Sequence, residues 1–293
     1  MPAAISDALE SVRLSIAGAL RDRVIGENAE DKRDAIMNAT GPRWFSESSP
    51  LLVVHSDASM FIGGMRALLF QSLHPLAMAG VAQHSDYRAD PWGRLQRTAD
   101  FVAATSFGNA DLAQHAVDRV RAVHKRVTGT TSDGRTYSAN DPHLLRWVHI
   151  AEVDSFLRAH QAYGAKPLDA AGYDQYVADM AVIARKLGVP APPTSVQGLR
   201  DQIAQFRGEL HGTTESRDAA KYLLITPPLD LTARVPYSLI AAAAIAILPA
   251  WARADLRLPY LPLTEQLVVK PIGQLLSSTI RWATSGDFAQ PTA

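Results

Sequence analysis

DPWGRLQRTADFVAATSFGNADLAQHAVDRVRAVHKRV, residues 90–127, predicts two consecutive α-helices and sets the expected fold class. Asp90 is suited to cap the first helix, and Pro91 fits its first turn because the missing N–H would be unpaired there. Gly108 is expected to end this helix. Asn109 then opens a second helix, which should run to about the end of the quoted stretch.

The same helical spacing of apolar residues dominates the chain on both sides of this stretch. His74 precedes Pro75 and should interrupt a helix over residues 60–83, because a residue before proline avoids the α region. Asp133-Gly134, between β-prone residues, predicts a small hairpin near 128–138. Further helices are expected at residues 143–161, 169–187, 195–210, 217–224, 237–248 and 263–282.

These elements predict an all-α (mainly α) chain, folded as a single multi-helix globular domain. A chain of 293 residues is long enough to bury a sizeable core. Residues 1–40 are expected to form an N-terminal helical segment packed on the main helical domain, which spans residues 41–285. The proline-rich stretch VPAPPT, residues 189–194, is the best candidate for an internal boundary.

The composition excludes several kinds of partner and chemistry. Twenty-nine Lys and Arg balance 29 Asp and Glu, so no basic field attracts a phosphate backbone, and nucleic acid is not expected as a partner. The chain has no cysteine, which removes disulfides, thiolate-ligated haem, iron–sulfur clusters and Cys-based zinc sites. Any metal must therefore be held by His, by a carboxylate or within a cofactor.

The apolar stretches do not predict a stable membrane span. The first 22 residues carry charges within their apolar part, unlike a signal peptide, and are expected to form an amphipathic surface helix. In VPYSLIAAAAIAILPAWA, residues 235–252, two prolines leave an uninterrupted helix of about 18 Å, too short for about 30 Å of hydrocarbon. A buried core helix is the better interpretation. We expect a cytoplasmic protein, with peripheral membrane association through the apolar C-terminal region as a further option.

The familiar catalytic strings are absent from this sequence. It has no G-x-S-x-G, no H-E-x-x-H, no Walker loop and no G-x-G-x-x-G, which disfavours the common hydrolase, zincin and nucleotide-binding classes. His149 and Glu152 are spaced i, i+3, but in the order opposite to the Glu-x-x-His of di-iron bundles, and no second copy exists. A di-iron site is therefore disfavoured.

Two groups of residues in the quoted stretch are candidates for a functional site. Arg94, Arg97 and Thr98 are spaced i, i+3, i+4 and project from one helix face. His124 continues an apolar stripe on the second helix and is expected to point inward, as a haem iron requires of its proximal ligand. Arg121, one turn earlier, could pair with a haem propionate. Two exposed arginines and a satisfied core histidine would give the same spacing, so the pattern alone leaves both interpretations open.

Longer motifs add a resemblance to a known family. The segments MRALLFQSLHPLAMAGVAQHSDYRADPWGRLQRTADFV (residues 65–102) and VRAVHKRVTGTTSDGRTYSANDPHLLRWVHIAEVDSFL (residues 120–157) contain the motifs HP-x(8)-HS, DP-x-GRLxRT, H-x-x-V-x-G and DPxLLxWVH. With them the chain, over about residues 40–285, resembles the DUF2236 family. That family contains the latex-clearing rubber oxygenases and the oxygenases of the mycophenolate pathway.

The resemblance implies a helical fold around a buried haem b, with dioxygen bound on the distal side. It assigns the proximal, metal-ligating role to His124 and the distal, catalytic positions to Arg94, Arg97 and Thr98. We add Arg121, His149 and His74 as further cofactor-binding candidates.

Two departures from the rubber-oxygenase branch affect the expected chemistry. Arg97 stands where that branch has a lysine, and a guanidinium stays protonated, so Arg97 should act as a hydrogen-bond donor and not cap the iron. The distal acid has no counterpart: Gln71 and His74 lie where it would fall, and no Glu occurs between Glu47 and Glu152. Rubber cleavage by the same mechanism is therefore not expected.

Three functional hypotheses follow from these observations. The first is a haem b-dependent oxygenase or related oxidoreductase that acts on dioxygen and a small apolar, terpenoid- or lipid-like substrate, as a monomer or homodimer. The second is a haem-binding or haem-sensing protein without turnover. The third is a non-haem member of the same fold, acting as a metal-dependent or interaction protein.

Overall fold

The computed structural model describes residues 3–26 and 28–285, and it confirms the mainly α-helical fold class. In these residues the β-structure consists of one antiparallel hairpin, in which Gly129 pairs with Tyr137, together with an isolated bridge between Arg43 and Asn109. The elements have the following bounds: α1 (Ala3–Val24), α2 (Ala29–Met37), α3 (Pro50–His55), α4 (Ser59–Gln71), α5 (Pro75–His84), α6 (Pro91–Phe107), α7 (Ala110–His124), β1 (Thr128–Thr130), β2 (Thr136–Ser138), α8 (Pro142–Tyr163), α9 (Ala170–Leu187), α10 (Val196–Phe206), α11 (Thr214–Leu224), α12 (Leu231–Ala246), α13 (Ala250–Leu256), α14 (Pro262–Thr264), the π-helical turn η1 (Glu265–Val269) and α15 (Lys270–Thr284).

Polar caps fix many of the helix starts. The side chain of Asp141 accepts a hydrogen bond from the backbone N–H of His143 at 2.8 Å, and α8 begins there. Asp169 and Ser195 cap α9 and α10 in the same manner. Gly188 ends α9 with a left-handed φ of 99°, a conformation that costs glycine least. These capped boundaries lie within a few residues of those expected from the sequence.

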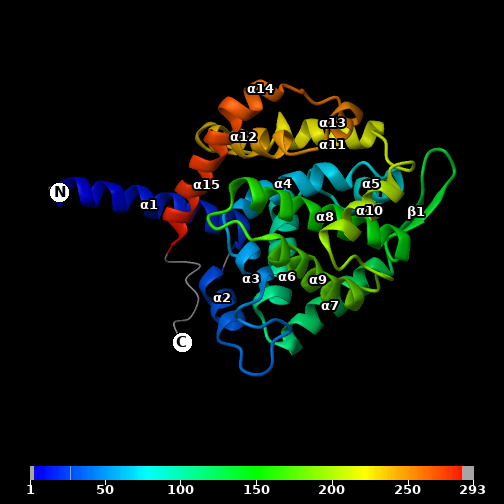
Figure 1. Ribbon diagram of the computed structural model, residues 1–293, viewed down its shortest axis with the longest axis horizontal. Helices are drawn as coiled ribbons and strands as arrows, with labels where there is room; N and C mark the ends of the chain where they lie inside the picture. Colours follow the sequence, from blue (N-terminus) through cyan, green and yellow to red (C-terminus); the bar gives the residue numbers. More distant parts are fainter. Residues whose placement is uncertain (1–2, 27, 286–293) are drawn as a thin grey trace.

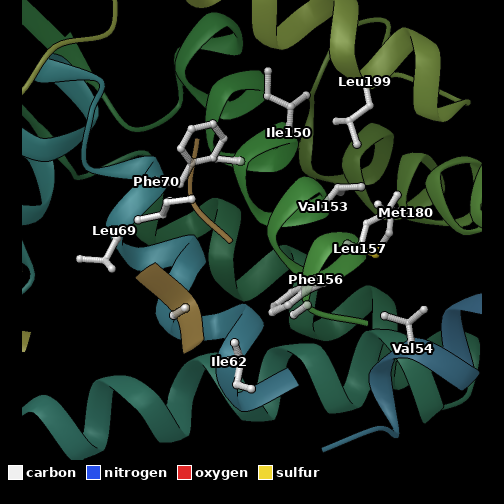
Figure 2. Close-up of a cluster of buried hydrophobic side chains, with 14 of the residues drawn as sticks. Val54, Ile62, Leu69, Phe70, Ile150, Val153, Phe156, Leu157, Met180 and Leu199 are labelled. Atoms are coloured by element: carbon white, nitrogen blue, oxygen red, sulfur yellow. The ribbon is translucent and has the colours of Figure 1, made fainter. Parts of the chain in front are cut away.

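The centre of the molecule is the contact between α4 and α8. Figure 2 shows Ile62, Leu69 and Phe70 of α4 beside Ile150 and Phe156 of α8, all of them buried. The two helices approach closely at Gly63, where an added Cβ would lie 2.7 Å from the ring of Phe156. Gly63 is therefore required for this packing, since even one methyl group would force the helices apart.

The other helices cover this central pair on two sides (Figure 1). Helices α11, α12 and α13 lie on one side, where α12 contacts α4. Helices α6, α7 and α9 lie on the other, with α9 contacting both α7 and α8. The N-terminal helix α1 contacts α6 and α15. Residues before and after the proline-rich stretch, such as Leu69 and Leu199, belong to one hydrophobic core.

The alanine-rich helix α12 begins earlier than expected. It starts at Leu231, so Pro236 lies inside it. Asp230 caps the helix by accepting from Ala233 N–H at 2.9 Å, and the missing proline N–H removes only one bond near the helix start. Ala243 and Ala244 are fully buried. No helix in residues 3–26 and 28–285 is both long and apolar enough to cross a bilayer.

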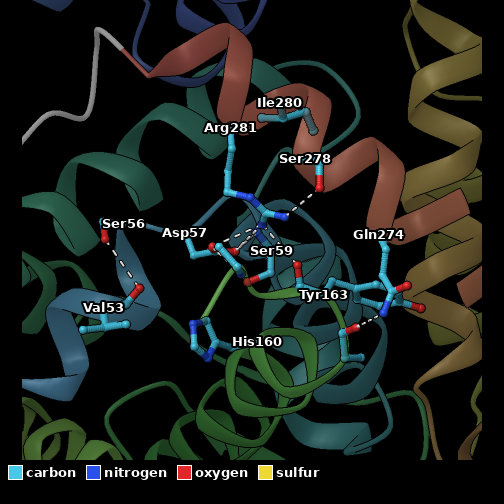
Figure 3. Close-up of polar contacts among 12 residues, drawn as sticks. Val53, Ser56, Asp57, Ser59, His160, Tyr163, Gln274, Ser278, Ile280 and Arg281 are labelled. Carbon is cyan, nitrogen blue, oxygen red and sulfur yellow. Dashed lines mark hydrogen bonds and ion pairs between the residues drawn. The ribbon is translucent and has the colours of Figure 1, made fainter. Parts of the chain in front are cut away.

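Asp57 ties the C-terminal helix to the rest of the fold. Figure 3 shows Arg281 of α15 directed at both carboxylate oxygens of Asp57, each at 3.2 Å, and at the carbonyl of Tyr163 at 3.1 Å. Burial alone would raise the pKa of Asp57. Hydrogen bonds from the N–H groups of Ser59 and Ala165, with the Arg281 charge, outweigh burial and lower that pKa. Asp57 therefore has a structural role as an ionised anchor.

Candidate functional site

The consecutive helices α6 and α7 contact each other and carry most of the predicted site residues. The Asp90 side chain accepts from Gly93 N–H at 2.9 Å to start α6, and the Asn109 side chain accepts from Leu112 N–H at 2.9 Å to start α7. Both predicted caps are confirmed. Helix α7 ends at His124, three residues short of Val127, because the carbonyl of Val127 accepts from Ala139 N–H and so joins the hairpin.

Arg94 and His124 lie at similar distances along their helices from the turn between α6 and α7. Arg94 lies nearly four turns before the end of α6, and His124 lies about four turns after the start of α7. At 1.5 Å per residue, both lie about 20 Å from the turn that joins the helices. The two helices contact each other, and both residues lie far along the chain from the turn between them.

His124 has the properties of an imidazole that is available to a ligand. The residue is half-buried, and its ring makes no hydrogen bond within the described part of the chain. Burial lowers its pKa below the usual 6.5, so the ring is neutral at pH 7. A neutral, unpartnered ring nitrogen is the form in which histidine binds a metal.

Arg94 is a partly desolvated cation without a counter-ion among the residues that the structure describes. It is half-buried, and within residues 3–26 and 28–285 no carboxylate pairs with it and no acceptor receives a hydrogen bond from its guanidinium. Burial lowers its pKa, and the charge of Arg97 acts in the same direction. Removing a cation from water is costly unless an anion or acceptor compensates, so Arg94 is suited to bind one.

The other three residues predicted on these helices lie on the solvent side. Arg97 is ion-paired with Asp90 at 3.0 Å, and 63% of its side chain is exposed. Thr98 is exposed and its hydroxyl donates to the carbonyl of Arg94 at 3.0 Å. Arg121 is also exposed. Of the five residues predicted on α6 and α7, Arg94 and His124 are therefore partly buried, whereas Arg97, Thr98 and Arg121 are exposed.

Two polar residues of α8, one buried and one half-buried, have side-chain atoms without hydrogen-bond partners in the described chain. His149 is 7% exposed, its Nε2 has no partner in the described chain, and burial lowers its pKa to about 4. Glu152, one turn later, is half-buried, and burial raises its pKa to about 7. Its carboxyl group makes no side-chain hydrogen bond to the described residues. Glu152 therefore exchanges a proton close to neutral pH.

A second set of buried polar side chains lies next to Glu152. Nδ1 of His55, at the end of α3, is hydrogen-bonded to the hydroxyl of Ser106 on α6 at 2.8 Å, and its Nε2 lies 3.4 Å from the hydroxyl of Tyr176 on α9. Burial lowers the pKa of His55 to about 3 and raises that of Tyr176 well above 10, with the charge of Glu152 adding to the latter. These groups are uncharged at neutral pH. They supply hydrogen bonds between α3, α6 and α9 without placing charge in the interior.

Sequence reasoning did not select His55, Ser106, Tyr176 or Glu152 as site residues. Glu152 carried one signal, its i, i+3 spacing from His149 on the same helix. The other three come from separate helices and are brought together only by tertiary packing.

The structure places His74 in a different environment from the other predicted residues. It caps α5, is 2% exposed, and its Nε2 lies 3.3 Å from a carboxylate oxygen of Glu209. His143 contacts the same carboxylate at 2.8 Å. His74 thus has protein partners of its own.

The fold and these residues define a mainly α-helical protein with neutral polar side chains between α3, α6, α8 and α9. Among the described residues it also has a partly buried histidine on α7 and a partly buried arginine on α6 without partners. Residues 52–282 match the family described as the catalytic domain of the ER-bound oxygenases mpaB/B′ and of rubber oxygenase, and the chain belongs to this family. The match covers every predicted site residue and confirms the resemblance seen in the sequence. No curated protein and no solved structure matched the chain.

Proposed function

We propose that the protein is a haem b-dependent oxygenase that acts on a small apolar, terpenoid- or lipid-like molecule, with His124 as the protein ligand of the iron. The observation that carries the proposal is the state of two partly buried side chains, His124 of α7 and Arg94 of α6. His124 is a neutral imidazole and Arg94 a guanidinium, and neither has a hydrogen-bonding or ionic partner among the described residues. Membership in an oxygenase family gives the class of reaction.

The residues present fit a haem. The buried residues of α6 and α7 all lie in the halves of the two helices nearer to the turn between them: Thr105, Ser106, Ala113, Ala116 and Val117. Towards Arg94 and His124 the inward side chains stay only partly buried. Neither α6 nor α7 packs closely along α8. A flat apolar cofactor beside His124 would give these side chains a partner, with Arg94 a donor to a carboxylate or to dioxygen.

Haem b, when bound, supplies the activation of dioxygen. The chain supplies the surroundings. Glu152, with a pKa of about 7, holds or releases a proton at Oε near neutral pH. His149, with a pKa of about 4, stays neutral and leaves Nε2 free as a donor or acceptor. Arg97 keeps its charge and is held by Asp90, so it can donate a hydrogen bond only after it leaves that carboxylate.

The test is an absorption spectrum of the purified chain before and after addition of hemin. We expect the parent chain to show a Soret band. In His124→Ala we expect this band to be absent, or the affinity for hemin to be at least tenfold lower than in the parent. His115→Ala is the matched control, because His115 lies on the same helix and is exposed. If His124→Ala binds hemin as the parent does, the assignment is wrong.

Oxygen uptake separates an oxygenase from a haem-sensing protein. We expect the haem-loaded chain to consume dioxygen when a terpenoid or a lipid-derived substrate is added, and Arg94→Met to lower that rate while His124 still binds haem. A haem-loaded chain that takes up no dioxygen with any member of a broad apolar panel would favour sensing over turnover.

We also propose that the C-terminal region rests on a lipid surface. Leu263, Leu267 and Leu275 are spaced four and eight residues apart along α14, η1 and α15, and each is about 70% exposed. Large apolar side chains exposed together mark an interaction surface. Other members of the family are described as ER-bound. Since the chain has no net charge, attraction to neutral lipid would come from apolar burial alone.

Sedimentation with neutral phosphatidylcholine vesicles tests this surface. We expect Leu267→Asp/Leu275→Asp to weaken binding more than tenfold, because two buried leucines contribute roughly 1.5–3 kcal/mol each. Leu14→Asp is the control, since Leu14 is similarly exposed but lies on α1. Equal sedimentation of the parent and the double variant would contradict the proposal.

A further inference from the structure

Three segments that are distant in the sequence meet at His74, His143 and Glu209. His74 precedes α5, His143 is the second residue of α8, and Glu209 follows the end of α10. One side-chain nitrogen or oxygen of each residue lies within 4.8 Å of the others. Two imidazoles and one carboxylate therefore converge at one point.

The backbone around this cluster is held in place by other contacts. The carbonyl of Gln71, three residues before His74, accepts from the indole N–H of Trp147 at 2.9 Å. The carbonyl of Leu73 accepts from His211 N–H at 3.0 Å, which ties the Glu209 segment beside His74. Pro75 keeps His74 extended, with φ −87° and ψ 114°. The three side chains are thus presented by a fixed frame, as a ligand site requires.

The two imidazole rings are also fixed by an aromatic neighbour. Phe206 stacks on His143 with ring centroids 4.5 Å apart, and it contacts His74 edge-on at 6.2 Å. The rings cannot turn away from Glu209 without losing this packing. Ligands that are already oriented bind with less loss of conformational entropy.

We propose that His74, His143 and Glu209 form a binding site for one divalent transition-metal ion. Nε2 of His143 lies 2.8 Å from Oε2 of Glu209, and Nε2 of His74 lies 3.3 Å from the same oxygen. Ligands about 2.0–2.1 Å from a tetrahedral zinc are roughly 3.3 Å apart, so a small adjustment accommodates the ion. Two histidines and one carboxylate are the protein ligands of catalytic zinc and of non-haem ferrous sites.

The site is open on one side. His74 is buried, whereas 42% of the His143 side chain and 46% of the Glu209 side chain are exposed. With three protein ligands the ion keeps at least one position for water or a small anion. An open site of this kind exchanges its metal with solvent, unlike a closed four-ligand structural site.

Arg146 opposes metal binding. Its guanidinium lies 3.4 Å from Nδ1 of His143 and over the ring of Phe206 at 5.7 Å. An arginine can only donate, so in this arrangement the His143 proton is on Nε2, where a metal would bind. A metal that binds at Nε2 has to displace that proton or move it to Nδ1. The Arg146 guanidinium must then move away from Nδ1 of His143. Removing the guanidinium should therefore strengthen binding.

Zinc titration of the full chain at a fixed haem content, followed by calorimetry, tests the site. We expect one Zn²⁺ per chain, with affinity reduced at least tenfold in His143→Ala and in Glu209→Gln. Arg146→Met is expected to bind more tightly. His115→Ala, on the exposed face of α7, is the control and should bind as the parent does. His143 and Glu209 are partly exposed, so their replacement leaves the buried core in place.

Thermal unfolding provides an independent measurement, because a metal that joins three segments stabilises only the folded chain. At a free Zn²⁺ concentration 100 times the Kd, the Tm should rise by about 5 °C, and this rise should be lost in Glu209→Gln. Fe²⁺ under anaerobic conditions, in a parallel titration, identifies the preferred metal. No zinc binding, or zinc binding that all of these variants leave unchanged, would overturn the proposal. Neither outcome bears on haem binding at His124.

Discussion

Asp154→Ala is expected to lower the free energy of unfolding by about 3–5 kcal/mol, because it leaves a buried guanidinium without its anion. Arg66 of α4 is 1% exposed and lies 2.6 Å from a carboxylate oxygen of Asp154 on α8. It also donates to the hydroxyl of Ser155 at 2.6 Å and to the carbonyl of Ile247 at 3.0 Å. Burial lowers the pKa of Arg66, and Asp154 opposes that shift. The carboxylate therefore keeps the cation inside the core.

Urea unfolding at pH 7 measures this effect, and a second variant separates it from general damage. Arg158 lies 3.3 Å from the other oxygen of Asp154 but is one-third exposed. Arg158→Ala should cost less than about 1 kcal/mol, as for most solvent-exposed pairs. Arg66→Met/Asp154→Leu should recover most of the stability that Asp154→Ala loses, since no buried charge is left unpaired. An Asp154→Ala loss no larger than that of Arg158→Ala would contradict this account.

The same pair shows what could be predicted from the sequence and what could not. Helix boundaries were predictable because their signals are local: Asp90, Asn109 and Asp141 each cap the helix that follows them. Arg66 and Asp154 are 88 residues apart, and nothing near either residue indicates the other. Their pairing depends on α4 packing against α8, which is a property of the tertiary structure.

Some residues of the candidate site were likewise predictable from the sequence, and others are brought together only by the tertiary structure. The spacing of residues 90–124 predicted that His124 and Arg94 lie on two successive helices, and the family resemblance supplied their proposed roles. The cluster of His55, Ser106 and Tyr176 comes from three helices and has no sequence motif. His74 was predicted beside the cofactor because of its place upstream of Arg94, a distance along the chain that says nothing of Glu209.

Glu152→Gln is expected to stabilise the haem-free protein by about 3 kcal/mol at pH 8 and by less than about 1 kcal/mol at pH 5. Burial raises the pKa of Glu152 from 4.5 to about 7. Between about pH 4.5 and pH 7, Glu152 keeps its proton in the folded chain but has released it in the unfolded chain. The free energy of unfolding of the parent therefore falls as pH rises from about 4.5 to 7. A glutamine of the same shape carries no such penalty, and the difference reaches its full size above pH 7.

Urea unfolding of the parent and of Glu152→Gln across pH 5–8 tests this result. Glu47→Gln serves as the control, since Glu47 is exposed and should give the same small change at every pH. The acid side of the profile has a separate origin. Burial lowers the pKa of His149 to about 4 and of His55 to about 3. The parent and Glu152→Gln therefore both lose stability as pH falls below about 6.5. A stability difference between the parent and Glu152→Gln that does not grow between pH 5 and 8 would show that Glu152 is solvated and carries no proton near neutral pH. It would then be unable to serve as the proton-exchanging group of the proposed oxygenase.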